Sequence, residues 1–222
     1  MKIAVVGNQL EFDEFSQKFG SMHECLCFTD HHFLDDELNV DCVFDFTISD
    51  SPEHFSFYED RLSVPIFLNT IKMTLAELAA YYPLNTEQVY GFNGMLTFIN
   101  REVLEITSLS DSPSFTIFED LKTAFQLVDD RVGMVTPRIV CMIINEAFYT
   151  MQEGTASPED IDSGMKLGTN YPFGPFEWLE KIGVSDVYEL LEALYEDTKE
   201  ECYKIAAALK KGYLSVQRIT PQ

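Results

Sequence analysis

The sequence predicts an α/β domain with a parallel, doubly wound sheet, followed by an all-helical domain. Over roughly the first 110 residues, short apolar runs that are typical of buried strands alternate with helix-length segments. A cluster of Ser, Asp and Pro at residues 109–114 indicates a linker. After Glu119 the apolar residues recur at helical spacing to the end of the chain.

The first domain is expected to hold a strand at each short apolar run. The expected strands are residues 2–6, 24–29, 41–47, 65–69 and 88–92, with further β structure within residues 96–108. The helices expected between them are residues 10–19, 52–62 and 74–82. The first of these helices carries Phe12, Phe15 and Phe19 at helical spacing, which favours packing on the sheet.

The helical domain is marked by strong start and stop residues. Its longest helix is expected at Val132–Met151, with apolar residues on more than one face. Gly154 suits the left-handed end of that helix. Ser157 followed by Pro158 is typical of a helix start. Further boundaries are expected at Gly168, at Pro172–Pro175, at Ser185 as a cap, and at Gly212 as the end of the last helix.

Composition excludes several function classes. The formal net charge of −22 repels phosphate backbones and anionic lipid, so no nucleic-acid or membrane partner is expected. No apolar run reaches the roughly 20 residues of a membrane helix, and no signal peptide is visible, which predicts a cytoplasmic protein. The five cysteines form no CxxC pair and predict neither a metal site nor a disulfide framework. Cys25 and Cys27 are expected to be reduced, core-facing thiols.

One long stretch, from Asp130 to Tyr195, matches a known pattern in register and without a gap. The matching strings are Asp130-Arg-Val-Gly133-Met-Val-Thr-Pro-Arg138, Asn145-Glu-Ala147, Glu153-Gly154, Ser157-Pro-Glu-Asp-Ile-Asp162, Met165-Lys-Leu-Gly168, Pro172-Phe-Gly-Pro175, Ile182-Gly183 and Leu190-Leu-Glu-Ala-Leu-Tyr195. This stretch resembles the C-terminal domain of the 3-hydroxyacyl-CoA dehydrogenase family. The resemblance implies a truncated Rossmann-like nucleotide domain at residues 1–112 and a helical dimerisation domain at residues 118–222. It also implies NAD as cofactor, an acyl-CoA ligand and a homodimer formed through the helical domain.

The resemblance can be followed into the expected cofactor site. A Rossmann site uses three glycines after the first strand, and here only Gly7 is present, with Gln9 and Phe12 in the other two places. The large ring of Phe12 stands where the helix should pack closely on the strand. Asp30 ends the second strand, where the family binds the ribose with an acid, or it serves as a turn residue.

Charge argues in the same direction at this turn. Glu11, Asp13 and Glu14 place three carboxylates in the first turn of the helix, where they suit the helix dipole but repel a pyrophosphate. NAD binding is therefore expected to be weak or absent.

The family's dehydrogenation uses a His as base, held by a Glu twelve residues later. Matching Gly91 and Leu104-Glu105-Ile106 to the pattern puts Glu105 on that Glu and Asn93 on the His. A second register, with a deletion, puts Leu96 or Thr97 there instead. Neither register supplies an imidazole.

Other positions of the family pattern are kept or replaced. Asn69 and Thr70 fit the family's Asn-Thr, but Ile71 replaces the Ser that contacts substrate. Pro137 replaces an Asn in the helical domain. The four histidines all precede residue 55, and the pair His31-His32 is expected in a solvated loop.

These observations predict a degenerate member of the family, without dehydrogenase activity but with the fold kept for dimerisation or ligand binding. The candidate site residues are Glu105, Asn93, Asn69, Gly7 and Asp30. A first alternative is an active NAD-dependent enzyme with a rebuilt site, in which Lys72, Lys122 or Tyr90 accepts the proton. A second alternative is a dimeric scaffold that binds no small molecule.

Overall fold

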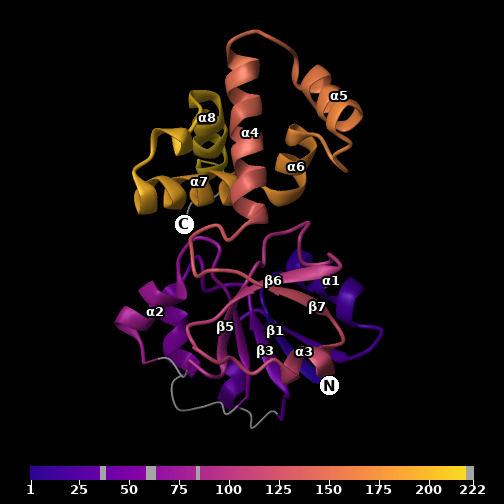
Figure 1. Ribbon diagram of the computed structural model, residues 1–222, viewed down its shortest axis with the longest axis vertical. Coiled ribbons are helices and arrows are strands. Elements are labelled where there is room, and N and C mark those ends of the chain that lie inside the picture. The colour runs from indigo at the N-terminus through magenta and orange to yellow at the C-terminus, as the bar shows by residue number, and fades with distance from the viewer. Residues whose placement is uncertain (36–38, 59–63, 84–85, 219–222) are drawn as a thin grey trace. The chain divides into compact units, whose positions relative to one another are not determined.

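The computed structural model describes residues 1–35, 39–58, 64–83 and 86–218, and the chain forms two compact units (Figure 1). Met1–Met134 is a sheet with helices, and Val135–Gln222 is helical throughout its described part. An α/β sheet domain followed by a helical domain is thus confirmed. The units divide later than the Ser-Pro cluster at residues 109–114, because one further helix and strand return to the sheet after that cluster.

Within the described residues, seven strands form one sheet in the order β2-β1-β3-β4-β5-β6-β7. All neighbouring pairs are parallel except β5 with β6. The chain passes from β2 across β1, so that β3 lies directly beside β1. The strands are β1 (Lys2–Val6), β2 (Glu24–Phe28), β3 (Cys42–Asp45), β4 (Ile66–Asn69), β5 (Val89–Phe92), β6 (Val103–Thr107) and β7 (Ala124–Leu127).

Each face of the sheet packs against its own set of helices (Figure 1). α1 (Gln9–Phe19) and α3 (Thr116–Leu121) cover one face, where the rings of Phe44 and Phe67 stack with centroids 4.4 Å apart. The short 3₁₀ helix η2 (Pro52–Tyr58) and α2 (Leu75–Tyr81) cover the other face. The predicted helix at 52–62 is therefore a 3₁₀ turn up to residue 58, and its last residues lie outside the described part of the chain.

In the helical unit, α4 (Thr136–Gln152) lies in the middle (Figure 1). α5 (Pro158–Thr169) and α6 (Pro175–Ile182) lie on one side of α4, and α7 (Val184–Thr198) and α8 (Ala207–Gln217) lie on the other. The buried side chain of Asn145 joins α4 to the start of α8: its Nδ2 donates to the Lys204 carbonyl at 2.8 Å, and its Oδ1 accepts from the Ala206 N–H at 2.9 Å.

Several helix boundaries follow the sequence prediction. The Ser157 side chain caps α5 by accepting from the Asp160 N–H, and Pro158 is the first helical residue. Gly154 has the expected positive φ of 75°. α5 runs through Gly168 to Thr169, and Asn170, with a φ of 57°, supplies the left-handed cap instead. No helix among the described residues has both the length and the apolar character needed to cross a membrane.

Other expectations were wrong. β7 occupies residues that the pattern assigned to helix, because Phe125 packs on the sheet core while its neighbours stay exposed. α7 begins at Val184 after Gly183, so Ser185 is not its cap, and α8 continues through Gly212. Cys27 is exposed and only Cys25 packs against the core, since β2 is an edge strand with a partly open face.

Two glycines give opposite expectations for the same substitution. A Cβ on Gly91 would overlap Thr70 Oγ1 and Thr107 Cγ2, so Gly91→Ala is expected to lower the free energy of unfolding by about 1–3 kcal/mol. Gly168 lies in α5 with open space where its Cβ would stand, so Gly168→Ala is expected to raise it by about 0.5–1 kcal/mol. Urea unfolding of both variants checks this pair, and equal effects would contradict it.

Candidate active site

Polar side chains are buried where three neighbouring parallel strands end. Asp45 ends β3, Asn69 ends β4 and Asn93 follows β5, with exposed fractions of 0%, 6% and 3%. Sheets of this kind bind ligands outside the carboxyl ends of their strands. Buried polar groups at that edge are therefore candidates for function as well as for structure.

Asn93 and Glu105 lie side by side. The antiparallel register of β5 and β6 pairs Phe92 with Ile106, and one step further the Asn93 N–H donates to the Glu105 carbonyl at 3.1 Å. The Asn93 Oδ1 accepts from the Met95 N–H at 3.2 Å, and Glu105 is buried, with 8% of the residue exposed. An amide at this place can donate or accept a hydrogen bond, but it cannot take up a proton near neutral pH.

The alternative register offers no better base. Leu96 packs against the sheet core, and Thr97 donates its backbone N–H to Glu14 Oε2 at 2.8 Å. The other oxygen of Glu14 accepts from the Asn100 N–H at 3.1 Å. Glu14 thus fixes the loop that follows Asn93 against α1.

Asn69 connects three strand ends. Its Oδ1 accepts from the Gly94 N–H at 3.1 Å, and its Nδ2 donates to the Phe46 carbonyl at 3.3 Å. Its own carbonyl accepts from Ser49 Oγ at 2.6 Å. These bonds hold the loops after β3 and β5 on the end of β4, so the geometry explains Asn69 as an organiser of this edge.

The turn between β1 and α1 is closed by its own side chains. Asn8 caps α1, its Oδ1 accepting from the N–H groups of Leu10 at 2.9 Å and Glu11 at 3.1 Å. Glu11 Oε2 accepts in return from the Asn8 N–H at 2.7 Å. Gly7 lies beneath this carboxylate, which stands 2.5 Å from where a Cβ on Gly7 would be.

Asp30 follows β2 and makes a local turn. It is exposed, and its Oδ1 accepts from the His32 N–H at 2.9 Å. Its carboxylate is therefore engaged with the chain's own backbone, as is common for Asp in such turns.

Residues 133–218 match the model of the 3-hydroxyacyl-CoA dehydrogenase C-terminal domain. The chain is 39% identical over 161 residues, 68% of its length, to a probable 3-hydroxybutyryl-CoA dehydrogenase of Bacillus subtilis. The chain belongs to the 3-hydroxyacyl-CoA dehydrogenase family. It is also 43% identical over 93 residues, 42% of its length, to the 3-hydroxyadipyl-CoA dehydrogenase of Escherichia coli. The chain spans 56% of the length of the first relative and 19% of the second.

Solved structures agree on the fold of this 3-hydroxyacyl-CoA dehydrogenase family member. The crystal structure of an (S)-3-hydroxybutyryl-CoA dehydrogenase from Ralstonia eutropha superposes with a TM-score of 0.71 at 20% identity. The match covers 97% of this chain and 94% of that one. The Rossmann-like sheet domain with a helical C-terminal domain is thus confirmed.

Two positions of the 3-hydroxyacyl-CoA dehydrogenase pattern carry apolar residues here. Ile71, at the Ser position, is 2% exposed, and its carbonyl accepts from the Gly133 N–H at 2.7 Å. Pro137, at the Asn position, is buried in the first turn of α4. Neither side chain offers a hydrogen bond to a substrate.

None of the three replacement bases that the sequence left open has a favourable setting. Burial raises the pKa of Tyr90, and its hydroxyl donates to the Ser114 carbonyl at 2.7 Å, so it is a poor proton acceptor. Lys72 Nζ pairs with Asp50 Oδ1 at 2.6 Å. Lys122 is exposed at the end of α3.

A buried cluster around Asp45 was missed by the sequence analysis, and the prediction that His31 is solvated was wrong. His31 is 5% exposed, and its Nε2 lies 2.8 Å from Asp45 Oδ2. The Tyr58 hydroxyl donates to the same oxygen at 2.8 Å. Thr47 donates both its N–H and its hydroxyl to Asp45 Oδ1, each at 2.7 Å. The available clue was an Asp at the end of β3, between the apolar residues Phe44 and Phe46, since a buried carboxylate must find donors.

The cluster rigidifies the fold and lies away from Asn93. Burial, followed by the charge of Asp45 and its hydrogen bond, raises the pKa of Tyr58 well above its usual range, so Tyr58 stays a neutral donor. β3 and β5 are separated by β4, which places their ends roughly 10 Å apart at about 4.8 Å per strand. The His31 imidazole therefore does not replace a base opposite Glu105.

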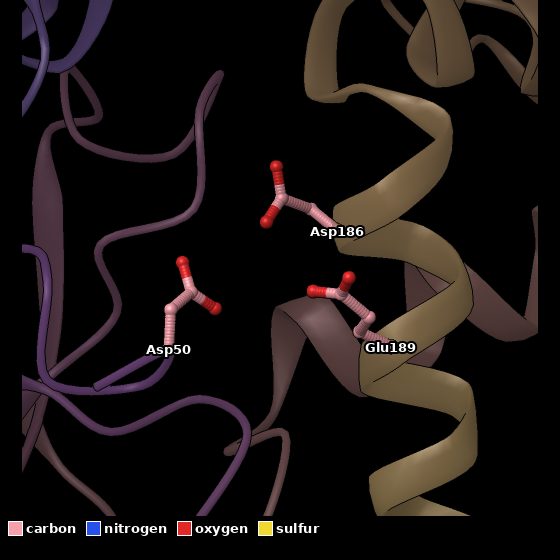
Figure 2. Close-up of side chains that lie close together, drawn as sticks. All are labelled: Asp50, Asp186 and Glu189. Atoms are coloured by element: carbon pink, nitrogen blue, oxygen red, sulfur yellow. The ribbon is translucent and has the colours of Figure 1, made fainter. Parts of the chain in front are cut away.

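The acidic side chains of Figure 2 belong to different units, Asp50 to the sheet unit and the other two to the helical unit. Asp50 follows β3 and is paired with Lys72. Asp186 and Glu189 lie one turn apart on α7, at the spacing of neighbours on a helix surface. Two carboxylates on one helix supply too few oxygen ligands for Ca²⁺ or Mg²⁺, so the helix by itself is not a metal site.

Proposed function

We propose that this chain is a member of the 3-hydroxyacyl-CoA dehydrogenase family that does not catalyse dehydrogenation and that binds an acyl-CoA as a homodimer. The observation that carries the proposal is the pairing of Asn93 with Glu105 at the end of β5. The oxidation of a 3-hydroxyacyl thioester needs a base for the hydroxyl proton while hydride leaves. Asn93 supplies none, and the four histidines of the chain all lie before residue 55.

The proposed ligand follows from the buried side-chain amides at the carboxyl ends of the parallel strands. The Asn93 amide is buried at that edge and is the kind of group that can fix a ligand carbonyl by hydrogen bonding, whereas the Asn69 amide already bonds the Gly94 N–H and the Phe46 carbonyl. The relatives named above are dehydrogenases of acyl-CoA substrates by their names. An amide can hold a thioester carbonyl without any proton transfer. A chain that has lost the base needed for dehydrogenation can therefore still bind an acyl-CoA.

The experiment is a parallel binding and turnover assay on the wild-type chain. Acetoacetyl-CoA is titrated by calorimetry, and NADH-dependent reduction of acetoacetyl-CoA is followed by absorbance. We expect saturable binding of acetoacetyl-CoA and no turnover above the background. Turnover at an ordinary enzymatic rate, on the order of 1–10³ s⁻¹, would overturn the proposal. Absence of acyl-CoA binding would instead favour a scaffold that binds no small molecule.

The dimer is supported by the apolar surface of α4. Ile139 is 52% exposed, and Ile143 lines two adjoining hollows of about 560 and 320 Å³ in the helical unit. The smaller hollow is formed mainly by apolar side chains of α4 and α5. Contiguous exposed apolar surface of this kind marks an interaction site. A second copy of the chain is the proposed occupant, as the family resemblance implies.

A charge placed in this surface tests the dimer. Ile143→Glu is expected to convert the dimer to a monomer, because the new carboxylate would be buried without a partner. Sedimentation equilibrium at micromolar concentration measures the change. Tyr81→Glu, at a residue that is 84% exposed on α2, is the matched control and should leave the dimer intact. A wild-type chain that sediments as a monomer would contradict the assignment.

A further inference from the structure

The turn from Gly7 to Phe12 is where a Rossmann-type domain receives the pyrophosphate of its dinucleotide. There the backbone N–H groups at the start of the first helix are the anion ligands. In this chain those of Asn8, Leu10 and Glu11 are occupied by the side chains of Glu11 and Asn8. The Phe12 N–H donates to the Asn8 carbonyl at 3.1 Å as part of the helix.

The space above the turn is filled as well. Glu11 Oε2 lies 2.5 Å from the place of a Cβ on Gly7, and the Phe46 Cβ lies 3.2 Å from the same point. A pyrophosphate approaches a Rossmann turn over this glycine, because the missing side chain leaves room for it. Here a carboxylate and an aromatic residue already stand there, so the residues of the turn do not fit the cofactor.

Charge strengthens the same conclusion. Residues 3–17 hold three carboxylates, Glu11, Asp13 and Glu14, and no Lys or Arg. Asp13 accepts from the Gln9 amide at 2.7 Å, which holds this carboxylate one turn into α1. Only Glu11 lies in the first turn of α1, and Glu14 is bound to the N–H groups of Thr97 and Asn100, so an incoming pyrophosphate would meet the like charge of Glu11 first.

We propose that the Glu11 carboxylate is an internal anion that takes the place of the dinucleotide pyrophosphate and closes this turn to NAD. Gly7 is kept because Glu11 needs the room above it, and not because a cofactor does. Glu11 closes the cofactor turn whether or not the chain binds an acyl-CoA, and titration with NADH tests this closure independently of acyl-CoA binding.

The test is calorimetric titration with NADH of the wild-type chain and of an opened variant, Asn8→Gly with Glu11→Ala. The wild type is expected to show no saturable binding up to about 1 mM NADH, and the opened variant to bind at least about tenfold more tightly than that limit. Circular dichroism and thermal melting establish that each variant is folded. If the double variant does not fold, Glu11→Ala alone is titrated, with the same gain expected in smaller measure.

The chain supplies a matched control. α2 begins with an equivalent capping box, in which Glu77 Oε2 accepts from the Thr74 N–H at 2.7 Å. Thr74→Gly with Glu77→Ala removes that box and should give no NADH binding. A wild-type dissociation constant of about 10 μM or less would overturn the inference. So would a folded opened variant with no greater affinity than the wild type.

Discussion

Replacing Asn93 by His is expected to leave the chain without measurable NADH-dependent reduction of acetoacetyl-CoA. The new imidazole would stand beside Glu105, and a positioned general base is worth about 10²–10⁴-fold. The substitution restores neither the Ser position, held by the buried Ile71, nor the cofactor turn, held by Glu11. Without bound NADH there is no hydride to transfer, so the imidazole introduced by Asn93→His cannot by itself restore the reaction.

The measurement is the steady-state rate at saturating acetoacetyl-CoA, with Asn100→His in the exposed part of the neighbouring loop as control. Both variants should match the wild type. Robust activity of Asn93→His alone would show that Asn93 was the sole defect and that the turn at Gly7 admits cofactor after all. A combined Asn93→His, Asn8→Gly, Glu11→Ala variant is the next step, since it supplies both missing parts.

Asp45→Ala is expected to cause the largest loss of stability in the sheet domain. The carboxylate accepts from His31 Nε2, the Tyr58 hydroxyl and both donors of Thr47. Each buried donor left without an acceptor costs about 1–3 kcal/mol. We expect a total loss of about 3–5 kcal/mol, a large part of the roughly 5–15 kcal/mol that stabilises a domain.

Urea unfolding at pH 7 measures this effect, with Asp111→Ala as the control on an exposed Asp that should change the free energy of unfolding by no more than about 0.5 kcal/mol. Tyr58→Phe removes a single donor and should cost less than Asp45→Ala, on the order of 1 kcal/mol. A loss below about 1 kcal/mol for Asp45→Ala would mean that the cluster does not hold the β2–β3 connection on the sheet.

The sequence predicted the fold class because its local patterns and its tertiary structure agree. β1, β4 and β5 are short apolar runs that became buried central strands, and Ser157-Pro158 starts a helix by local hydrogen bonding alone. β7 could not be predicted in this way. Its strand conformation depends on pairing with β6, from Val103↔Ala124 to Ile106↔Leu127, and four residues carry too little periodicity of their own.

Within the candidate site, spacing along the sequence predicted the pair of Asn93 and Glu105 but not the pair of His31 and Asp45. Asn93 directly follows β5 and Glu105 lies on β6, the next strand along the chain, so a twelve-residue spacing sufficed to place one beside the other. His31 reaches Asp45 only because the β2–β3 connection crosses over β1, and no local pattern in residues 29–47 specifies that crossing. His31 and Asp45 are both buried, and their burial depends on tertiary structure that a local sequence pattern does not specify.

The capping box at the start of α1 also has an evolutionary consequence. The N-cap Asn8 contributes about 1 kcal/mol to its helix, and Glu11 completes the capping box at the positive end of the helix, so both residues are favoured by stability alone. A lineage returning toward dinucleotide binding would have to give up that stability first, and new glycines at positions 9 and 12 would bring no benefit until it had done so. The box therefore opposes a return to dinucleotide binding, and Gly7 and Glu11 are expected to persist together among this chain's descendants.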